Sequence, residues 1–264
     1  MNRLRNEGWK RGLWILAGIA VLGVFTALLA GPVPQDPAYH GFVDGRSFFG
    51  IPNALNVLSN LPFVMIGAVG LAHVLAQSPG EGYESRFEQG VLAAMCLGIV
   101  GIGFGSSYYH LLPDNGRLVW DRLPMAVVFS TLLVALIYER IDATWARRLL
   151  LPWLLLSVGT VWFWHWGELH GEGDLRPYAF VQFYTLVAGP LIYLLFPPRY
   201  THGRDLLVAV AYYVLAKAAE LLDGWIFERG IELSGHTLKH LFAGLAVAWL
   251  VRMVVRRRPL AQPS

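Results

Sequence analysis

The sequence is poor in charged residues and has a single cysteine. Of its 264 residues, 15% are charged and 55% are hydrophobic, whereas soluble domains carry about 25% charged residues. This composition is typical of a chain that lies in lipid. The one cysteine, Cys96, lies within an apolar segment, which excludes an intrachain disulfide and a CxxC metal site. No run of Lys and Arg interleaved with aromatic residues occurs, so nucleic acid is not an expected partner.

Eight segments are apolar and approximately long enough to cross a bilayer, which takes about 20 residues per helix. They are residues 12–31, 53–76, 88–110, 117–139, 149–168, 177–197, 206–224 and 236–255. The connecting stretches are short and rich in turn-forming residues. No small-residue cleavage site follows the first segment, so we expect a retained anchor helix and not a signal peptide. The sequence therefore predicts an all-α polytopic membrane protein.

The distribution of Lys and Arg predicts the orientation of these spans. Most of these residues flank the spans on the side of the two termini, and the other side carries only Arg46, Arg117, Arg122, Arg176 and Arg229. Because the cytoplasmic side of a membrane protein is the richer in Lys and Arg, we expect both termini in the cytoplasm. With this orientation, the outer face holds one end of the third, fourth and eighth segments, and in each segment this is the end with polar side chains.

Those ends carry three histidines, one aspartate and one serine. Ser106 and His110 are four residues apart, as are His236 and His240, so each pair shares a helical face. Three histidine ligands are typical of catalytic zinc, which keeps a fourth position for a water of lowered pKa. Asp121 is a candidate to take that water's proton and deliver it to a leaving amine. Ser106 is a candidate to hydrogen-bond a developing oxyanion.

Each of these residues also has a simpler interpretation. Histidines at this spacing more often pack or form hydrogen bonds, and Asp121 suits the start of a helix. Ser106, in the glycine-rich run GIGFGSS, suits close helix packing. The simpler interpretation must, however, explain why five polar groups meet at one membrane face, where an unpartnered polar group is costly. The joint pattern therefore favours a zinc site.

The same residues carry a family resemblance. S-x-x-x-H, an aspartate eleven residues later and a terminal H-x-x-x-H resemble the alkaline ceramidase family, within a group of seven-helix membrane hydrolases that includes adiponectin-receptor-type proteins. The stretches VLSN (57–60), GFGSSYYH (103–110) and DRLPM (121–125) are similar to those of ceramidases. YHGFVDGR and SGHTLKH resemble the bacterial branch. The resemblance covers about residues 39–255.

The resemblance implies a zinc-dependent hydrolase in the inner membrane of a bacterium that splits ceramide, a membrane lipid, into a sphingoid base and a fatty acid. It makes His110, His236 and His240 the zinc ligands, with Asp121 and Ser106 assisting catalysis. It also implies three parts: an extra transmembrane helix in residues 1–35, a seven-helix domain in 36–258, and a tail in 259–264. Calcium does not follow from the resemblance, because the sequence lacks the family's WCE-like stretch and has asparagine at position 53, where calcium-binding members have glutamate.

Further polar residues lie in the apolar segments. Three asparagines at i, i+3 and i+7 form either a polar wall facing the site or a set of interhelical hydrogen bonds. In the seventh segment, a lysine and a glutamate three apart suggest an ion pair. This glutamate and a nearby aspartate are candidates to hold the ring N–H groups of metal-bound histidines. These residues are Asn53, Asn56, Asn60, Lys217, Glu220 and Asp223.

Two other functions fit parts of the pattern. A lipid-sensing receptor or binding protein on the same scaffold would use zinc structurally and would not need Asp121 as a base. A metal transporter would spread its ligands through the bilayer, whereas these gather at one side. We therefore expect a hydrolase.

Overall fold

A computed structural model describes residues 7–260, and every regular element in that range is helical. The elements are α1 (Glu7–Leu29), the short 3-10 helix η2 (Pro37–His40), α2 (Ala54–Leu58), α3 (Leu61–Ala76), α4 (Arg86–Leu111), α5 (Asn115–Arg140), α6 (Ala143–Leu169), α7 (Arg176–Leu195), α8 (Asp205–Leu221), α9 (Asp223–Phe227) and α10 (Gly235–Arg256). The all-α prediction is confirmed. The predicted tail, residues 259–264, lies mostly outside the described residues.

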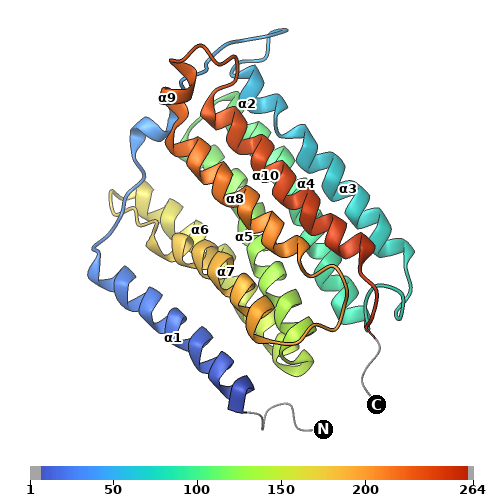
Figure 1. Cartoon of the computed structure of the whole chain (residues 1–264). Coiled ribbons are helices and arrows are strands. Elements are labelled where there is room, and N and C mark those ends of the chain that lie inside the picture. The colour runs from blue at the N-terminus through green and yellow to red at the C-terminus, as the bar shows by residue number, and fades with distance from the viewer. Residues whose placement is uncertain (1–6, 261–264) are drawn as a thin grey trace.

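The long helices form one bundle with α5 at its centre (Figure 1). Helix α5 packs against α4, α6 and α7, while α10 packs against α8 and α3. The start of α10 lies beside α2 and α9 at one end of the bundle, and the start of α1 and the end of α10 lie at the opposite end (Figure 1). This arrangement brings the polar ends of α4, α5 and α10 together.

Helix α1 lies at the edge of the bundle, against α7 (Figure 1). The Trp9 ring meets the Phe196 ring edge-on at 5.0 Å, and Arg176 donates a hydrogen bond of 2.7 Å to the Ala27 carbonyl oxygen. Most other large apolar side chains of α1, such as Leu22 and Phe25, are exposed, as expected of a helix that faces lipid. The division of the chain into an extra helix and a seven-helix domain stays a prediction.

Within residues 7–260, seven spans are long and apolar enough to cross a membrane, if α2 and α3 are taken as one. The eighth predicted span, 206–224, corresponds to α8, which has only 17 residues and carries Lys217 and Glu220. The integral membrane character is therefore supported, and the count of eight spans stays a prediction.

The predicted single helix over residues 53–76 is broken. Helix α2 ends at Leu58, residues 59 and 60 form a turn, and α3 begins with Pro62 in its first turn. Proline has no N–H to donate to the carbonyl four residues back, so a helix cannot continue through it unperturbed. Asn53 precedes α2 with a left-handed backbone (φ 48°), so the three asparagines do not share one continuous helical face.

The helix starts near the polar ends follow from capping residues in the sequence. The Asp114 side chain accepts a hydrogen bond from the backbone N–H of Arg117 at the start of α5. The Ser234 side chain accepts one from the N–H of Thr237 at the start of α10. Such caps satisfy backbone donors that the first turn of a helix leaves without partners. They fix the residues at which α5 and α10 begin. They therefore also set where the polar residues of these two helices lie along the axis of the bundle.

Candidate metal centre and lipid cavity

Three buried histidines bring one ring nitrogen each to a common point. His110 lies in the last turn of α4, and His236 and His240 lie one turn apart at the start of α10. The His110 Nε2 atom is 3.2 Å from the His240 Nε2 atom and 3.4 Å from the His236 Nε2 atom. The three residues are between 1% and 5% exposed.

The donor set fits a divalent metal ion such as zinc. Ligands at 2.0–2.1 Å from a tetrahedral zinc ion are about 3.3 Å apart, and the two Nε2 separations above are close to this value. Imidazole nitrogens that face one another cannot all carry protons, whereas a shared cation satisfies all their lone pairs at once. The three ligand atoms form the one histidine, cysteine or carboxylate cluster with metal-binding spacing among residues 7–260.

Helix α2 and the turn after it orient the His240 ring. The Ser59 Oγ atom lies 2.8 Å from His240 Nδ1 and donates its own proton to the Asn56 carbonyl oxygen at 3.2 Å. Ser59 can therefore only accept from His240, which places the ring proton on Nδ1 and leaves the Nε2 lone pair for a metal. The Asn56 side chain ties this turn to α10 by accepting a 2.9 Å hydrogen bond from Thr237.

Loop residues hold the other two histidines. The Phe42 ring packs on His110 and His236, with ring centroids 4.6 and 4.7 Å away. The Asn53 side chain donates a 2.9 Å hydrogen bond to the His110 carbonyl oxygen. Asp223, at the start of α9, accepts a 2.8 Å hydrogen bond from the His236 backbone N–H. Asn53 and Asp223 therefore contact the backbone of the ligand helices and not the imidazole rings.

Asp121 and Ser106 lie together beside the histidines. The Ser106 side chain lies next to the Asp121 carboxylate, and both residues are buried. Gly105 permits this contact, because a Cβ atom at that position would lie 2.0 Å from the Trp120 carbonyl oxygen. The absence of a side chain at Gly105 thus lets α4 and α5 approach closely where their two polar residues meet.

An elongated cavity of about 320 Å³ begins at this polar cluster. Ser106, Asp121 and His240 line it. Its lining extends from residue 121 to 132 on α5 and from 239 to 250 on α10, a length of about 16 Å at 1.5 Å per helical residue. Away from the histidines the lining is almost entirely apolar.

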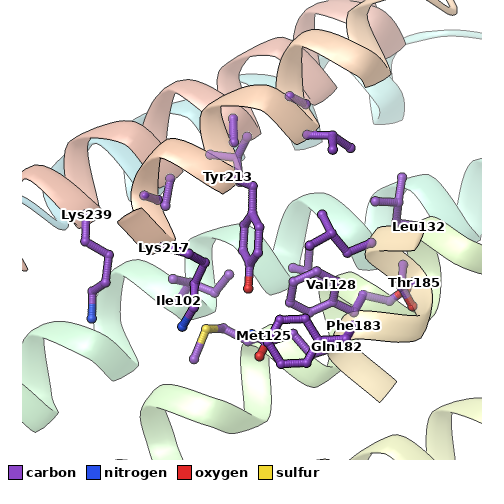
Figure 2. A pocket seen from close by; sticks show the side chains of 18 of the residues that line it. Ile102, Met125, Val128, Leu132, Gln182, Phe183, Thr185, Tyr213, Lys217 and Lys239 are labelled. Carbon is purple, nitrogen blue, oxygen red and sulfur yellow. The ribbon is translucent and has the colours of Figure 1, made fainter. Parts of the chain in front are cut away.

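Figure 2 shows the two ends of this cavity. Lys217 and Lys239 point their amino groups toward one end, while Leu132 and Thr185 lie at the other, with the Tyr213 ring between them. Phe183 of α7 lines the cavity and is itself 46% exposed.

A charged cluster lies at the polar end. The Glu220 carboxylate accepts hydrogen bonds from Lys217 and from Lys239, the latter at 3.1 Å. The Tyr39 hydroxyl, in η2, donates to the same carboxylate at 3.4 Å. Burial and the nearby Glu220 carboxylate raise the pKa of Tyr39, so its hydroxyl stays protonated. Glu220 is thus held by three donors and does not contact a histidine ring.

The structure brings together the five residues from which the sequence analysis predicted a zinc site, namely Ser106, His110, Asp121, His236 and His240. Of the other six, three line the same cavity and three hold the surrounding backbone and turns. The first group is Asn60, Lys217 and Glu220, and the second is Asn53, Asn56 and Asp223.

Sequence reasoning missed Tyr39, Arg122 and Lys239, which also line the cavity. For Lys239 a signal existed, because it lies between the two histidines of HTLKH, three residues after the first. Tyr39 lies in a loop whose path no periodic pattern predicts.

Comparison with known proteins agrees with this geometry. A family model described as Ceramidase matches residues 50–258. The match includes the three histidines, Ser106 and Asp121, and leaves α1 and η2 outside. No curated protein and no solved structure matches the chain.

Proposed function

The chain belongs to the ceramidase family, and from this premise we propose that it is a zinc-dependent hydrolase of ceramide or a related N-acyl lipid. The observation that carries the proposal is the convergence of three buried imidazole nitrogens, 3.2 and 3.4 Å apart, beside a carboxylate at the polar end of an apolar cavity.

His110, His236 and His240 would hold the metal. Zinc bound by three histidines keeps a position for water, lowers the pKa of that water toward neutrality and polarises a bound carbonyl group. The burial of the three rings and the Phe42 side chain against two of them keep bulk solvent away. Charges that develop during the reaction are then stabilised more strongly than they would be in water.

Asp121 would act as the general base and then as the general acid. Its carboxylate takes the proton of the attacking water and returns it to the nitrogen of the departing amine. Ser106 has only one hydroxyl proton, which it would donate to the neighbouring Asp121 carboxylate before the reaction. Once Asp121 is protonated, its hold on this hydroxyl weakens, and Ser106 becomes free to donate to the oxygen of the amide.

The cavity would hold an acyl chain of the lipid. Its apolar lining between α5, α7, α8 and α10 suits a hydrocarbon chain, while the polar end presents the amide to Asp121 and the histidines. We propose that a lipid enters beside Phe183, which lines the cavity and is 46% exposed, so that it would not need to leave the bilayer. With both termini in the cytoplasm, as the Lys and Arg distribution predicts, the site would draw on the outer leaflet.

Release of fatty acid from a panel of N-acyl lipids tests this function. The full-length protein, purified in detergent, should contain about one zinc per chain and should release fatty acid, followed by mass spectrometry. A chelator should abolish the release, and added zinc should restore it. His236→Ala should lose metal and activity together, whereas His170→Ala, which changes an exposed histidine of the loop after α6, should lose neither.

Two results would contradict the proposal. Folded wild-type protein without bound metal would remove the basis of the mechanism. Protein that binds zinc and the lipids but releases no fatty acid from any of them would favour a lipid-sensing receptor or binding protein on the same scaffold.

A further inference from the structure

Arg122 is a buried cation with an unused donor. It lies on α5, next to Asp121, lines the cavity and is 7% exposed. Its Nη1 atom has no hydrogen-bond partner among the described residues. Arg122 forms none of the ion pairs found in residues 7–260. A buried guanidinium without an anion is unfavourable, most of all within a membrane, so such residues commonly mark binding sites.

The rest of the Arg122 side chain is held in place. Its Nη2 atom donates a 2.6 Å hydrogen bond to the Gln35 side-chain oxygen. The guanidinium carbon lies 4.1 Å from the centre of the Trp164 ring, which is fully buried. Because one nitrogen and one face are fixed in this way, the buried Nη1 atom is held in one position within a residue that lines the cavity. If Arg122 served only as a structural tether to Gln35, its Nη2 atom would be sufficient, and its Nη1 atom would have no role.

A second unused donor lies beside it. The Tyr178 hydroxyl of α7 is buried, has no hydrogen-bond partner in the described part of the chain, and belongs to a residue that also lines the cavity. The Arg122 guanidinium carbon lies 5.3 Å from the centre of the Tyr178 ring. The Arg122 Nη1 atom and the Tyr178 hydroxyl lack acceptors and belong to neighbouring side chains of one cavity, a pair of donors that suits an anion with at least two oxygens, namely a carboxylate or a phosphate.

The charge balance of the cavity also favours an anion. Three cationic side chains line it, against the carboxylates of Asp121 and Glu220. The three are Arg122, Lys217 and Lys239. Since both lysines pair with Glu220, Arg122 is the one of the three that forms no ion pair among the residues described, and its nearest carboxylate influence is that of Asp121, the preceding residue.

We propose that Arg122 and Tyr178 form a subsite for an acidic group at the polar end of the lipid. The preferred substrates would then be N-acyl lipids whose amine part carries a carboxylate or a phosphate, in preference to neutral ones of the same chain length. This inference extends the proposed function, because it names the substrate class of the same cavity. It concerns binding, so it is testable without turnover.

Binding of two lipids that differ only in charge tests the subsite. N-Palmitoylglycine and N-palmitoylethanolamine share the acyl chain and the amide, but only the first carries a carboxylate. Full-length protein in detergent, treated with chelator so that neither lipid is hydrolysed, is titrated with each and with palmitate. We expect N-palmitoylglycine to bind about 10- to 100-fold more tightly than N-palmitoylethanolamine, the range expected for hydrogen bonds to a charged group.

The ratio of the two affinities is the readout in the variants, so a general loss of lipid binding does not count. Arg122→Gln should bring the ratio close to one. Tyr178→Phe keeps the ring and removes only the hydroxyl, and it should lower the ratio about threefold to tenfold. If chelation destabilises the protein, the zinc-loaded Asp121→Asn variant, which keeps all three histidines, serves as the background.

The outcomes separate this inference from the proposed function. A wild-type ratio near one, or a ratio that Arg122→Gln leaves unchanged, would overturn the subsite even if the protein hydrolyses ceramide. Tight Arg122-dependent binding of palmitate alone would also overturn it, because the anion would then be the released fatty acid. A charge preference that depends on Arg122 in a protein that hydrolyses no lipid would support the subsite and contradict the hydrolase.

Discussion

Gly105→Ala tests whether the close approach of α4 and α5 positions the catalytic pair. The new Cβ atom would lie 2.0 Å from the Trp120 carbonyl oxygen and 2.8 Å from its carbonyl carbon. Both are backbone atoms of α5, so no side-chain rotation relieves the clash. Because Cβ contacts under 3.0 Å essentially never occur, α5 must move away from α4 by about 1 Å.

This displacement acts directly on the site. Ser106 follows Gly105, and Asp121 follows Trp120, so the separated helices would pull apart the Ser106 hydroxyl and the Asp121 carboxylate. A misplacement of about 1 Å in an active site costs on the order of 100-fold in rate. Overpacking costs about 1–3 kcal/mol in stability, which the better helix propensity of alanine offsets by about 1 kcal/mol.

The assay compares three quantities in detergent: the rate of fatty-acid release, the zinc content and the thermal unfolding midpoint. Gly105→Ala should lose about 99% of the rate while retaining zinc, because the ligands lie on α4 and α10 and not on α5. Gly90→Ala is the matched control on the same helix, since a Cβ atom there meets nothing within 4 Å. The reasoning is refuted if Gly105→Ala hydrolyses lipid within about threefold of this control.

Three further predictions concern single side chains. Asp121→Asn should leave the zinc content unchanged and lower turnover about 10²- to 10⁴-fold, as measured by fatty-acid release; an unaltered rate would remove its role as the base. Ser59→Ala should weaken zinc binding about 10- to 100-fold in competition with a chelator, because His240 loses the acceptor that fixes its ring proton. Hydrogen bonds from Arg46 hold the pKa of Asp44 below its usual value of 3.8, so this contact stabilises the fold above that value and is lost as the pH falls through the lowered pKa. The unfolding midpoint should therefore fall less in Asp44→Asn than in the wild type between about pH 5 and about pH 3, and equal slopes would contradict the assignment.

The sequence predicted the long helices well because apolar runs act locally. The predicted spans from 117 and from 236 begin within two residues of α5 and α10, whose starts follow the capping residues Asp114 and Ser234. The convergence of the histidines followed from two facts that a sequence contains: their spacing of four residues, and the number of spans that separate them. That count places His110 and His236 at the same face of the membrane.

Other features depend on contacts that a sequence does not contain. The loop between α1 and α2 folds over the site and places Phe42 on two of the histidines, and no periodic pattern specifies that path. The break after α2 had a visible signal in Pro62, but the apolar run around it suggested one continuous helix. Arg122 was interpreted as an ordinary outer-face charge, because only the fold reveals which of its nitrogens have partners.

The position of His236 and His240 at the start of α10 has a consequence for biosynthesis. His110 is made 126 residues before His236 and 130 residues before His240. A nascent chain in which α3 to α9 are complete still has only one of the three imidazoles of the proposed site, so it could neither retain the proposed ion nor act prematurely on the lipids around it. Insertion of α10 would therefore complete the proposed reaction centre.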